Sequence, residues 1–316
     1  MLRRYFFLIF ILLLQFGCAR HTHNLPKPPP AVKSTVLTRA MPAFNQVVVT
    51  GAVNVSLHTG YKHSEVILHG NSQDIQQTIT QVGNKQLLVR PNGGRGQGSI
   101  SVEIRTNHLN SFSYKGNGTI AGRHIHSSLL DLKINNPGQA TFGGSIGLRK
   151  LEVSGGGMIQ ISDIYSRDLK LDIKDKTKVL LVGQMSPSHL ELIGEGWLSM
   201  YWVKSTNLTI CAKGKMNIRL AGIVDKLDIE LWGASHFDGR YLRAQNAFVK
   251  TYGKSIAELT AIKHQHTLAT DASDIYFYNI PQTKADFMAY QGSVLDMRDW
   301  NSPDLKDYDR FNKETH

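Results

Sequence analysis

A small residue recurs every 18–20 residues through most of this 316-residue chain, and no other feature of the sequence constrains the fold as strongly. The series is Gly118, Gly138, Gly157, Thr177, Gly196, Gly214, Gly233, Gly253, Ser273 and Ser293. Mostly apolar residues stand four and six positions before each member and two positions after it, as Ile210, Leu208 and Met216 do around Gly214. Such period-2 alternation is typical of strands, and the 3.6-residue period of a helix is absent.

A unit of about 20 residues with one apolar face cannot bury that face alone, but it can when stacked on copies of itself. We therefore predict an all-β fold, a right-handed parallel β-helix (β-solenoid) with about ten regular coils after residue 110. The small residues would form one column at a corner where every coil bends. Asp175 and Asp271, just before that column, should bond backbone or face water. A third apolar position per coil predicts three-sided coils (Ile125, Ile164, Val203, Ile223 and Ile262).

The segment before the regular coils also alternates, in VVVTGAVNVSL, EVILHG, QLLVR and ISVEI, with the turn-like RPNGGRGQG between the last two. We expect it to form the first coils together with a protruding hairpin or a cap, within one domain spanning 41–300. GGRGQG imitates a phosphate-binding loop, but a strand pattern and no helix follows it, so a hairpin tip is the better interpretation. The polar tail 301–316 is expected to cover the last coil or to fray.

The beginning of the chain predicts export. Arg3 and Arg4 precede an apolar run from Tyr5 to Leu14, which is a secretory signal pattern over 1–17. Gly17–Cys18 resembles the lipobox of bacterial lipoproteins, in which the cysteine carries fatty acids such as palmitate; Gln15 departs from that pattern, and an ordinary cleaved signal is the alternative. Ala19 favours, by the same resemblance, the bacterial outer membrane, with the periplasmic or surface-facing side left open. Residues 18–40 read as a proline-rich tether.

The chain is basic, with a formal net charge of +11. In a cell envelope, this charge favours anionic polysaccharide, lipopolysaccharide or lipid headgroups as partners, and not nucleic acid. If Cys18 carries lipid, Cys211 is the remaining cysteine, so the domain must be held together by its core without an internal disulfide.

The stretches FNQVVVTGAVNVSLHTG, LLVRP and ISVEIRTNHLNSFSYKGNGTIAG, followed by the glycine-punctuated coils, resemble the head GIN domain family of autotransporter-adhesin-like proteins. The resemblance covers about 41–300 and rests on rhythm and strand order. It implies an exported or lipid-anchored bacterial protein with a β-helical fold. It carries no functional residues over to this sequence.

Catalysis is not predicted, and neither is a cofactor. Glycoside hydrolysis needs two carboxylates flanking one bond, and Asp228 and Glu230 share a strand face with Lys226, as on an ordinary solvated surface. The motifs typical of β-helical pectin hydrolases are absent from the sequence. The candidate carboxylates on the coils are Asp172, Glu191, Asp228 and Glu230.

The histidines and Cys211 also favour structural roles. His264 and His266, like His124 and His126, alternate on a strand and could supply two imidazoles to a metal. No carboxylate or cysteine ligand lies at a persuasive sequence spacing, so we predict exposed turn histidines and no metal. Cys211 lies in an outward column without a paired base, which favours packing over nucleophilic chemistry.

Lysines and aromatic residues flank the small column on five successive coils. Aromatic faces stack on sugar rings, and ammonium groups pair with carboxylates or phosphates; a merely solvated surface is the alternative interpretation. The strip predicts an envelope-anchored, non-catalytic binding or adhesion module for an anionic glycan. The alternatives are a structural scaffold that binds envelope proteins and, less favoured, a polysaccharide-cleaving enzyme. The proposed ligand-binding residues are Lys176, Lys178, Trp197, Lys213, Lys215, Trp232, Tyr252 and Lys254.

Overall fold

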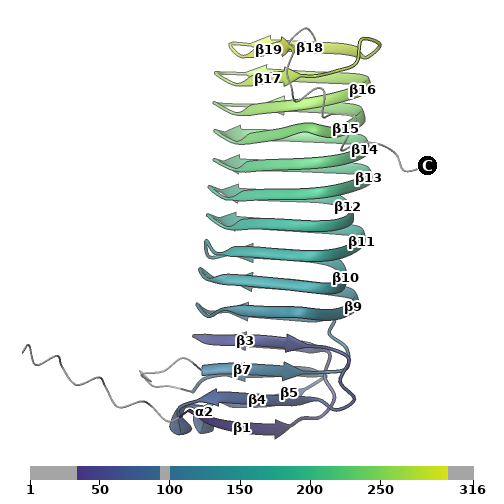
Figure 1. Cartoon of the computed structure of the whole chain (residues 1–316). Helices are drawn as coiled ribbons and strands as arrows, with labels where there is room; N and C mark the ends of the chain where they lie inside the picture. Colours follow the sequence, from purple (N-terminus) through teal and green to yellow (C-terminus); the bar gives the residue numbers. More distant parts are fainter. Residues whose placement is uncertain (1–33, 93–99, 298–316) are drawn as a thin grey trace, which may run out of the picture. The chain divides into compact units, whose positions relative to one another are not determined.

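A computed structural model describes residues 34–92 and 100–297. The fold is all-β, with 75% of the described residues in strands and a β-solenoid of about nine turns (Figure 1). The predicted fold class is therefore confirmed, with about one turn fewer than expected. The predicted signal peptide, Cys18, most of the tether, the tip of RPNGGRGQG and the tail 301–316 lie outside the described residues.

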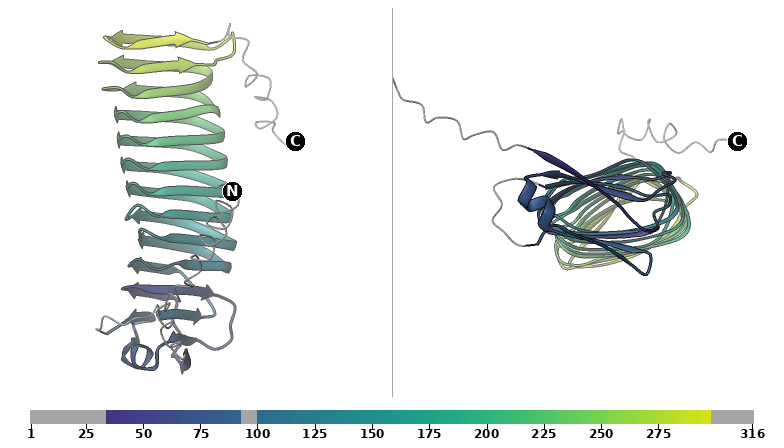
Figure 2. Two further views of the ribbon diagram at one scale, coloured as in Figure 1. Left: turned by 60° about the vertical axis from the view of Figure 1, so that its left-hand side comes forward. Right: turned by 90° about the horizontal axis from the view of Figure 1, so that it is seen from below.

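Each regular coil is one long bent strand that pairs in parallel with the next coil. The strands end above one another along one edge of the stack (Figure 1), and the coils superpose when seen along the axis (Figure 2). They are β9 (Ile120–Asn135), β10 (Gln139–Ser154), β11 (Met158–Asp175), β12 (Lys178–Gly194), β13 (Trp197–Gly214), β14 (Asn217–Gly233), β15 (His236–Thr251) and β16 (Ile256–Thr270).

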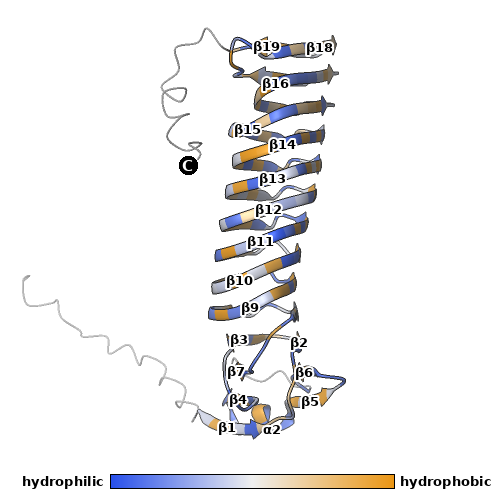
Figure 3. Cartoon of the chain, turned by 90° about the vertical axis from the view of Figure 1, so that its right-hand side faces the viewer, coloured by the Kyte–Doolittle hydropathy of each residue, from blue (hydrophilic) through white to orange (hydrophobic). Residues whose placement is uncertain are grey.

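Burial along a coil falls into three runs. In β12 the inward residues are Val179 and Leu181, then Met185 and Pro187, then Leu190 and Leu192. Three residues separate the first two runs and two residues separate the last two, and none of these five is buried. Apolar and polar residues alternate accordingly along the coils (Figure 3). The third apolar position is thus confirmed, although Ile223 and Ile262 are only half-buried while their neighbours Val224 and Ala261 are fully buried.

The corner contains two small-residue columns and not the single column predicted. The first, here called the corner column, has positive φ at every residue, a conformation that glycine adopts freely and that short polar residues tolerate. The second, the inner column, lies two residues later and is buried from Gly157 onward. The corner column consists of Gly155, Asp175, Gly194, Gly214, Gly233, Gly253, Asp271 and Gln291. The inner column begins at the half-buried Gly138 and continues through Gly157, Thr177, Gly196, Met216, Ser235, Ser255 and Ser273.

The predicted series passes from one column to the other. Gly214 pairs in register with Gly194, whereas Gly196 accepts a backbone hydrogen bond from Asn217, so Met216 is its counterpart. Gly214 therefore ends a strand and does not lie inside one. Asp175 and Asp271 are exposed and accept hydrogen bonds from Gly155 N (2.9 Å) and Gly253 N (3.0 Å), which confirms the role expected of both carboxylates.

The first coils are built out of chain order. Strand β2 (Gln46–Thr50) lies between β6 (Gln86–Arg90) and β8 (Ser111–Lys115), and β3 (Val53–His58) lies between β7 (Ile100–Arg105) and β9, all in parallel. The expectation of first coils with a hairpin or cap is confirmed, because β5 (Ile79–Gly83) forms an antiparallel hairpin with β6.

Antiparallel strands close this end of the solenoid. Strand β4 (Glu65–Gly70) pairs antiparallel with both β7 and β1 (Thr35–Ala40), and α2 (Ser72–Gln77) buries Ile75 against the core. Residues 35–40, assigned above to the tether, are thus part of the folded unit. Among the residues that the structure describes, no helix combines the length and apolarity needed to cross a membrane.

Short strands form the other end of the described stack. The last strands are β17 (Asp274–Phe277), β18 (Lys284–Tyr290) and β19 (Ser293–Asp296). Most of β18 is exposed, including the apolar side chains of Phe287, Met288 and Tyr290.

Candidate functional site

The eight predicted binding residues all lie at the corner edge, but in three stacked columns. Lys213, Trp232 and Tyr252 lie just before the corner, with Lys213 and Trp232 in register. Lys176, Lys215 and Lys254 lie at its tip, directly after the corner column. Lys178 and Trp197 lie just after it and are also in register. A ligand reaching all eight residues would have to wrap the corner.

The column before the corner carries an aromatic pair. The rings of Trp232 and Tyr252 stack with centroids 3.9 Å apart and planes within 11°. The indole N–H of Trp232 also donates to Glu230 Oε1 at 2.7 Å. Because the two rings cover each other, a sugar can reach their edges and outer faces but not the space between them.

The lysines differ in how far their charge is already neutralised. Lys176 forms an ion pair with Glu195 (Nζ–Oε2 3.1 Å). Within the described ranges, no ion pair involves Lys178, Lys213, Lys215 or Lys254. These four exposed ammonium groups therefore remain available to an anionic ligand.

A hollow of about 650 Å³ brings three of the eight residues together. Lys178 and Lys215 lie on either side of Trp197, whose indole is half-buried, and Glu195, Asn217 and His236 complete the lining. An aromatic face between two cations suits a ring that carries an acidic group. In this hollow, one tryptophan and two lysines of the predicted strip line the same concavity.

A larger hollow, of about 850 Å³, lies away from the corner and was not predicted. Its lining includes Tyr165 and Leu129, each more than half exposed, together with Arg149, which is ion-paired with Asp131. Further along, Trp202 is 64% exposed and has φ +62°, at a bend where Gly183 and Gly222 of the adjacent coils also have positive φ. Gly222 pairs with Val203, so Trp202 lies one residue before the glycine position, at an irregularity in the register.

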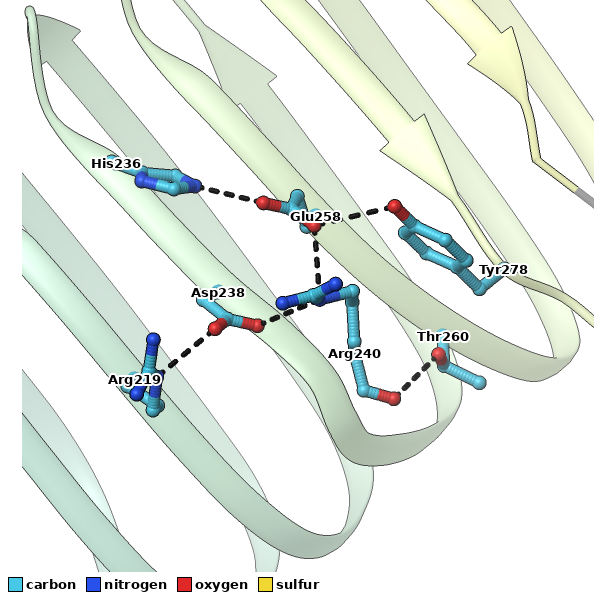
Figure 4. A network of polar contacts seen from close by, with 7 residues as sticks. All are labelled: Arg219, His236, Asp238, Arg240, Glu258, Thr260 and Tyr278. Atoms are coloured by element: carbon cyan, nitrogen blue, oxygen red, sulfur yellow. Dashed lines mark hydrogen bonds and ion pairs between the residues drawn. The ribbon is translucent and has the colours of Figure 1, made fainter. Parts of the chain in front are cut away.

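A charged network covers β14–β16 just after the corner (Figure 4). Arg219 and Arg240 each bind the Asp238 carboxylate through Nε (3.0 and 3.2 Å), and Arg240 also contacts Glu258 at 3.0 Å. Burial alone would raise the pKa of Asp238, but the hydrogen bonds and charges of Arg240 and Arg219 bring the pKa below its ordinary value. His236 and Tyr278 complete the contacts of Glu258. The network is internally compensated and offers no free charge of either sign to an ionic ligand.

The carboxylates do not favour acid–base catalysis. Asp172 and Glu191 are in register on adjacent coils, as are Cys211 and Glu230, but Lys174 pairs with Asp172 at 3.0 Å. Nearby, hydrogen bonds from Lys133 and Lys150 lower the pKa of Glu152 to about 2. A general acid working near neutral pH needs a raised pKa, and both shifted carboxyl groups, Glu152 and Asp238, are shifted downward. Burial raises the pKa of the Cys211 thiol, which disfavours the reactive thiolate.

The histidine prediction needs one correction. His264 and His266 are half-buried on β16, and Asp286 of β18 lies in register with His266, so a carboxylate does stand beside this pair. The coil repeat places it 20 residues further along, outside any local spacing motif. His124 and His126 are exposed, as predicted, and no carboxylate contact of theirs is found in the described part of the chain.

A family profile described as "Putative auto-transporter adhesin, head GIN domain" matches residues 43–174 and 144–281. A crystal structure titled as a "putative adhesin" from Parabacteroides distasonis is 14% identical, with TM-score 0.45, over 84% of this chain and 98% of its own. Another, from Parabacteroides merdae, is 12% identical, with TM-score 0.44, over 84% and 96%. A "putative lipid binding protein" from Parabacteroides distasonis is 11% identical, with TM-score 0.42, over 83% and 96%. No curated protein matches the chain.

Proposed function

Because this chain belongs to the head GIN domain family of "putative auto-transporter adhesins", we propose that it is a non-catalytic binding and adhesion module of the bacterial cell envelope. The proposed ligand is an anionic glycan. The observation that carries the proposal is the hollow in which Trp197 lies between Lys178 and Lys215. Lys213, Lys254 and the Trp232–Tyr252 pair extend the same surface around the corner.

The charge of the surface supports this ligand class. Four uncompensated lysines on one edge attract a polyanion, and salt should weaken that attraction because exposed charges are screened within about 10 Å at 0.1 M ionic strength. The rigid stack fixes the backbone positions from which the lysines and the half-buried indole project, so no rearrangement of the backbone is needed on binding.

Glycan binding is tested with alginate and heparin as probes, at low and high salt. We expect the Trp197→Ala/Trp232→Ala double variant to bind at least about tenfold more weakly than the wild type, because buried aromatic anchors dominate the free energy of binding. We expect Lys178→Ala/Lys215→Ala to bind more weakly at low salt and to show a smaller dependence on salt. Binding constants and their salt dependence are the measurements.

The matched control is Trp202→Ala, which removes a tryptophan that is 64% exposed and lies away from the corner. Unchanged binding in this variant, with loss in the double variant, places the ligand at the corner. Loss only in Trp202→Ala would move the site to the other bend. Equal binding by the wild type and the double variant would show that the corner is not the site, and release of reducing ends from a bound glycan would show that the protein is an enzyme.

We propose that Cys18 carries the lipid that anchors the module in the outer membrane. Replacing Cys18 by serine is expected to move the protein from the membrane fraction to the soluble fraction. Serine at this position has no thiol to carry the lipid, so the proposed lipid anchor is lost. Fractionation and labelling with a fatty-acid probe measure this. Membrane association and labelling that persist in Cys18→Ser would contradict the anchor, and protease treatment of intact cells distinguishes the two faces.

A scaffold that binds envelope proteins is the second candidate. It is favoured by the apolar side chains exposed on the last coil, where Phe287, Met288, Tyr290 and Leu295 are 45–69% exposed. Two results together would favour the scaffold over the glycan-binding module. Cross-linkers placed on β18 would capture an envelope protein, and the same preparation would bind neither alginate nor heparin.

A further inference from the structure

We propose that His264, His266 and Asp286 form a binding site for a zinc ion on the outside of the solenoid. The Nδ1 or Nε2 atoms of the two histidines and a carboxylate oxygen of Asp286 all lie within 4.8 Å of one another. Two imidazoles and one carboxylate are a ligand set that zinc uses where a fourth position is left to water.

The coil register brings the three residues together. His264 and His266 are alternate residues of β16, so they project from the same face of the strand. On the next coil, β18 places Asp286 directly beside His266 and Lys284 beside His264. The side chains therefore come from two strands that are hydrogen-bonded to each other, which fixes the distance between their backbones.

The side chains are already oriented toward one another. His266 Nδ1 lies 3.3 Å from Asp286 Oδ2, and the two imidazole rings are nearly parallel with centroids 5.3 Å apart. Phe248 stacks on the ring of His266 at 4.9 Å, which restricts its rotation. Ligand atoms around tetrahedral zinc lie roughly 3.3 Å apart at bond lengths of about 2.0–2.1 Å, so the site closes when the ligand atoms approach from separations of at most 4.8 Å to about 3.3 Å.

One positively charged side chain lies next to the proposed zinc site. Lys284 is the cationic neighbour of His264 on β18, and its side chain is exposed. Its flexible stem allows the ammonium group to turn toward solvent when a metal binds. Asn246 stands on the other side of His264 and is uncharged.

Zinc at this site would link the last regular coil to β18. Six of the seven residues of β18 are exposed, so few side-chain contacts hold this strand to the stack. Ligands from β16 and β18 would add a cross-link between them and make the final coil open less often. The role is structural and does not depend on the glycan site, which lies at the corner.

The test uses the full chain without a histidine tag, with ZnCl₂ as the ligand in titration calorimetry. We expect Asp286→Asn and His266→Gln each to weaken the zinc affinity of this site at least about tenfold, since each removes a metal bond. His124→Gln, which removes an exposed histidine elsewhere on the coils, is the matched control and should leave the affinity unchanged. Cobalt(II) should give the strong absorption of a tetrahedral site in the wild type and not in Asp286→Asn.

Hydrogen exchange locates the effect. Zinc should slow exchange of the β18 amides several-fold in the wild type and leave them unchanged in Asp286→Asn, which alters a side chain that is 70% exposed. Equal zinc affinity in the wild type and both site variants, or exchange that slows only outside β16 and β18, would overturn the proposal.

Discussion

Replacing Gly214 by valine is expected to destabilise the solenoid by roughly 3 kcal/mol. Gly214 has φ +104°, a conformation that costs a β-branched residue about 1–2 kcal/mol. In addition, a Cβ atom at this position would lie 2.4 Å from the carbonyl oxygen of Gly194 on the coil below, and backbone cannot move aside as a flexible side chain can. Urea unfolding followed by circular dichroism measures the loss.

Two further variants separate these contributions. Gly83→Val is the control, because a Cβ there meets no atom within 4 Å, and its effect should stay within about 0.5 kcal/mol. Gly214→Asp should cost less than Gly214→Val, because Asp175 and Asp271 already occupy the corner column with positive φ. If Gly214→Val is as stable as Gly83→Val, the corner does not depend on small residues.

Replacing Phe237 by alanine is expected to cost about 4 kcal/mol. Phe237 is completely buried, and it stacks between Ile218 of β14 and Ala257 of β16. Its ring occupies the space in which Gly239 has no side chain, since a Cβ on Gly239 would lie 2.2 Å from the ring. Truncation of Phe237 therefore leaves a cavity that neither Ala257 nor Gly239 can fill. Thermal and urea unfolding measure the effect.

The neighbouring alanine provides the matched test. Ala257→Leu alone should destabilise by about 1–3 kcal/mol through overpacking. In the Phe237→Ala background the same change should recover part of the lost stability, because the leucine enters the cavity. Simple addition of the two single effects would show that the two side chains do not share one layer of the core.

The fold could be predicted from the sequence because the repeated small residues reflect a backbone conformation that recurs in successive coils. A residue with positive φ at the corner of the coils from β10 onward selects mainly glycine or a short polar residue, and inward positions select apolar residues. The register could not be predicted to the same precision. Gly196 and Gly214 are both small, but one belongs to the inner column and the other to the corner column. Composition alone does not distinguish two columns that are two residues apart.

The first coils show a second limit. Strand order in the sequence suggests that successive strands stack in succession, whereas β2 lies between β6 and β8. Alternating burial indicates which side of each strand faces the core, but it carries no information about which strand is the neighbour.

The positions of candidate site residues could be predicted only where the repeat places those residues in a stacked column. The corner lysines and tryptophans follow from the repeat, and their role in binding stays a prediction. The contact between Asp286 and His266 joins two coils, so no local sequence spacing indicates it. The prominence of Trp202 does not follow from the small column, because this residue lies at another bend.

Stacking of equivalent side chains has a consequence for any polymeric ligand. Residues of one column repeat along the axis at about 4.8 Å. A polymer lying along this axis keeps its contacts when it shifts by a whole number of coils only if its own repeat is commensurate with that spacing. A polymer with an incommensurate repeat would instead occupy many positions of similar energy. The residue type in a column changes from coil to coil, as at Lys213, whose in-register neighbours are Ile193 and Trp232. Such differences make the positions along the axis unequal in binding energy and select one of them.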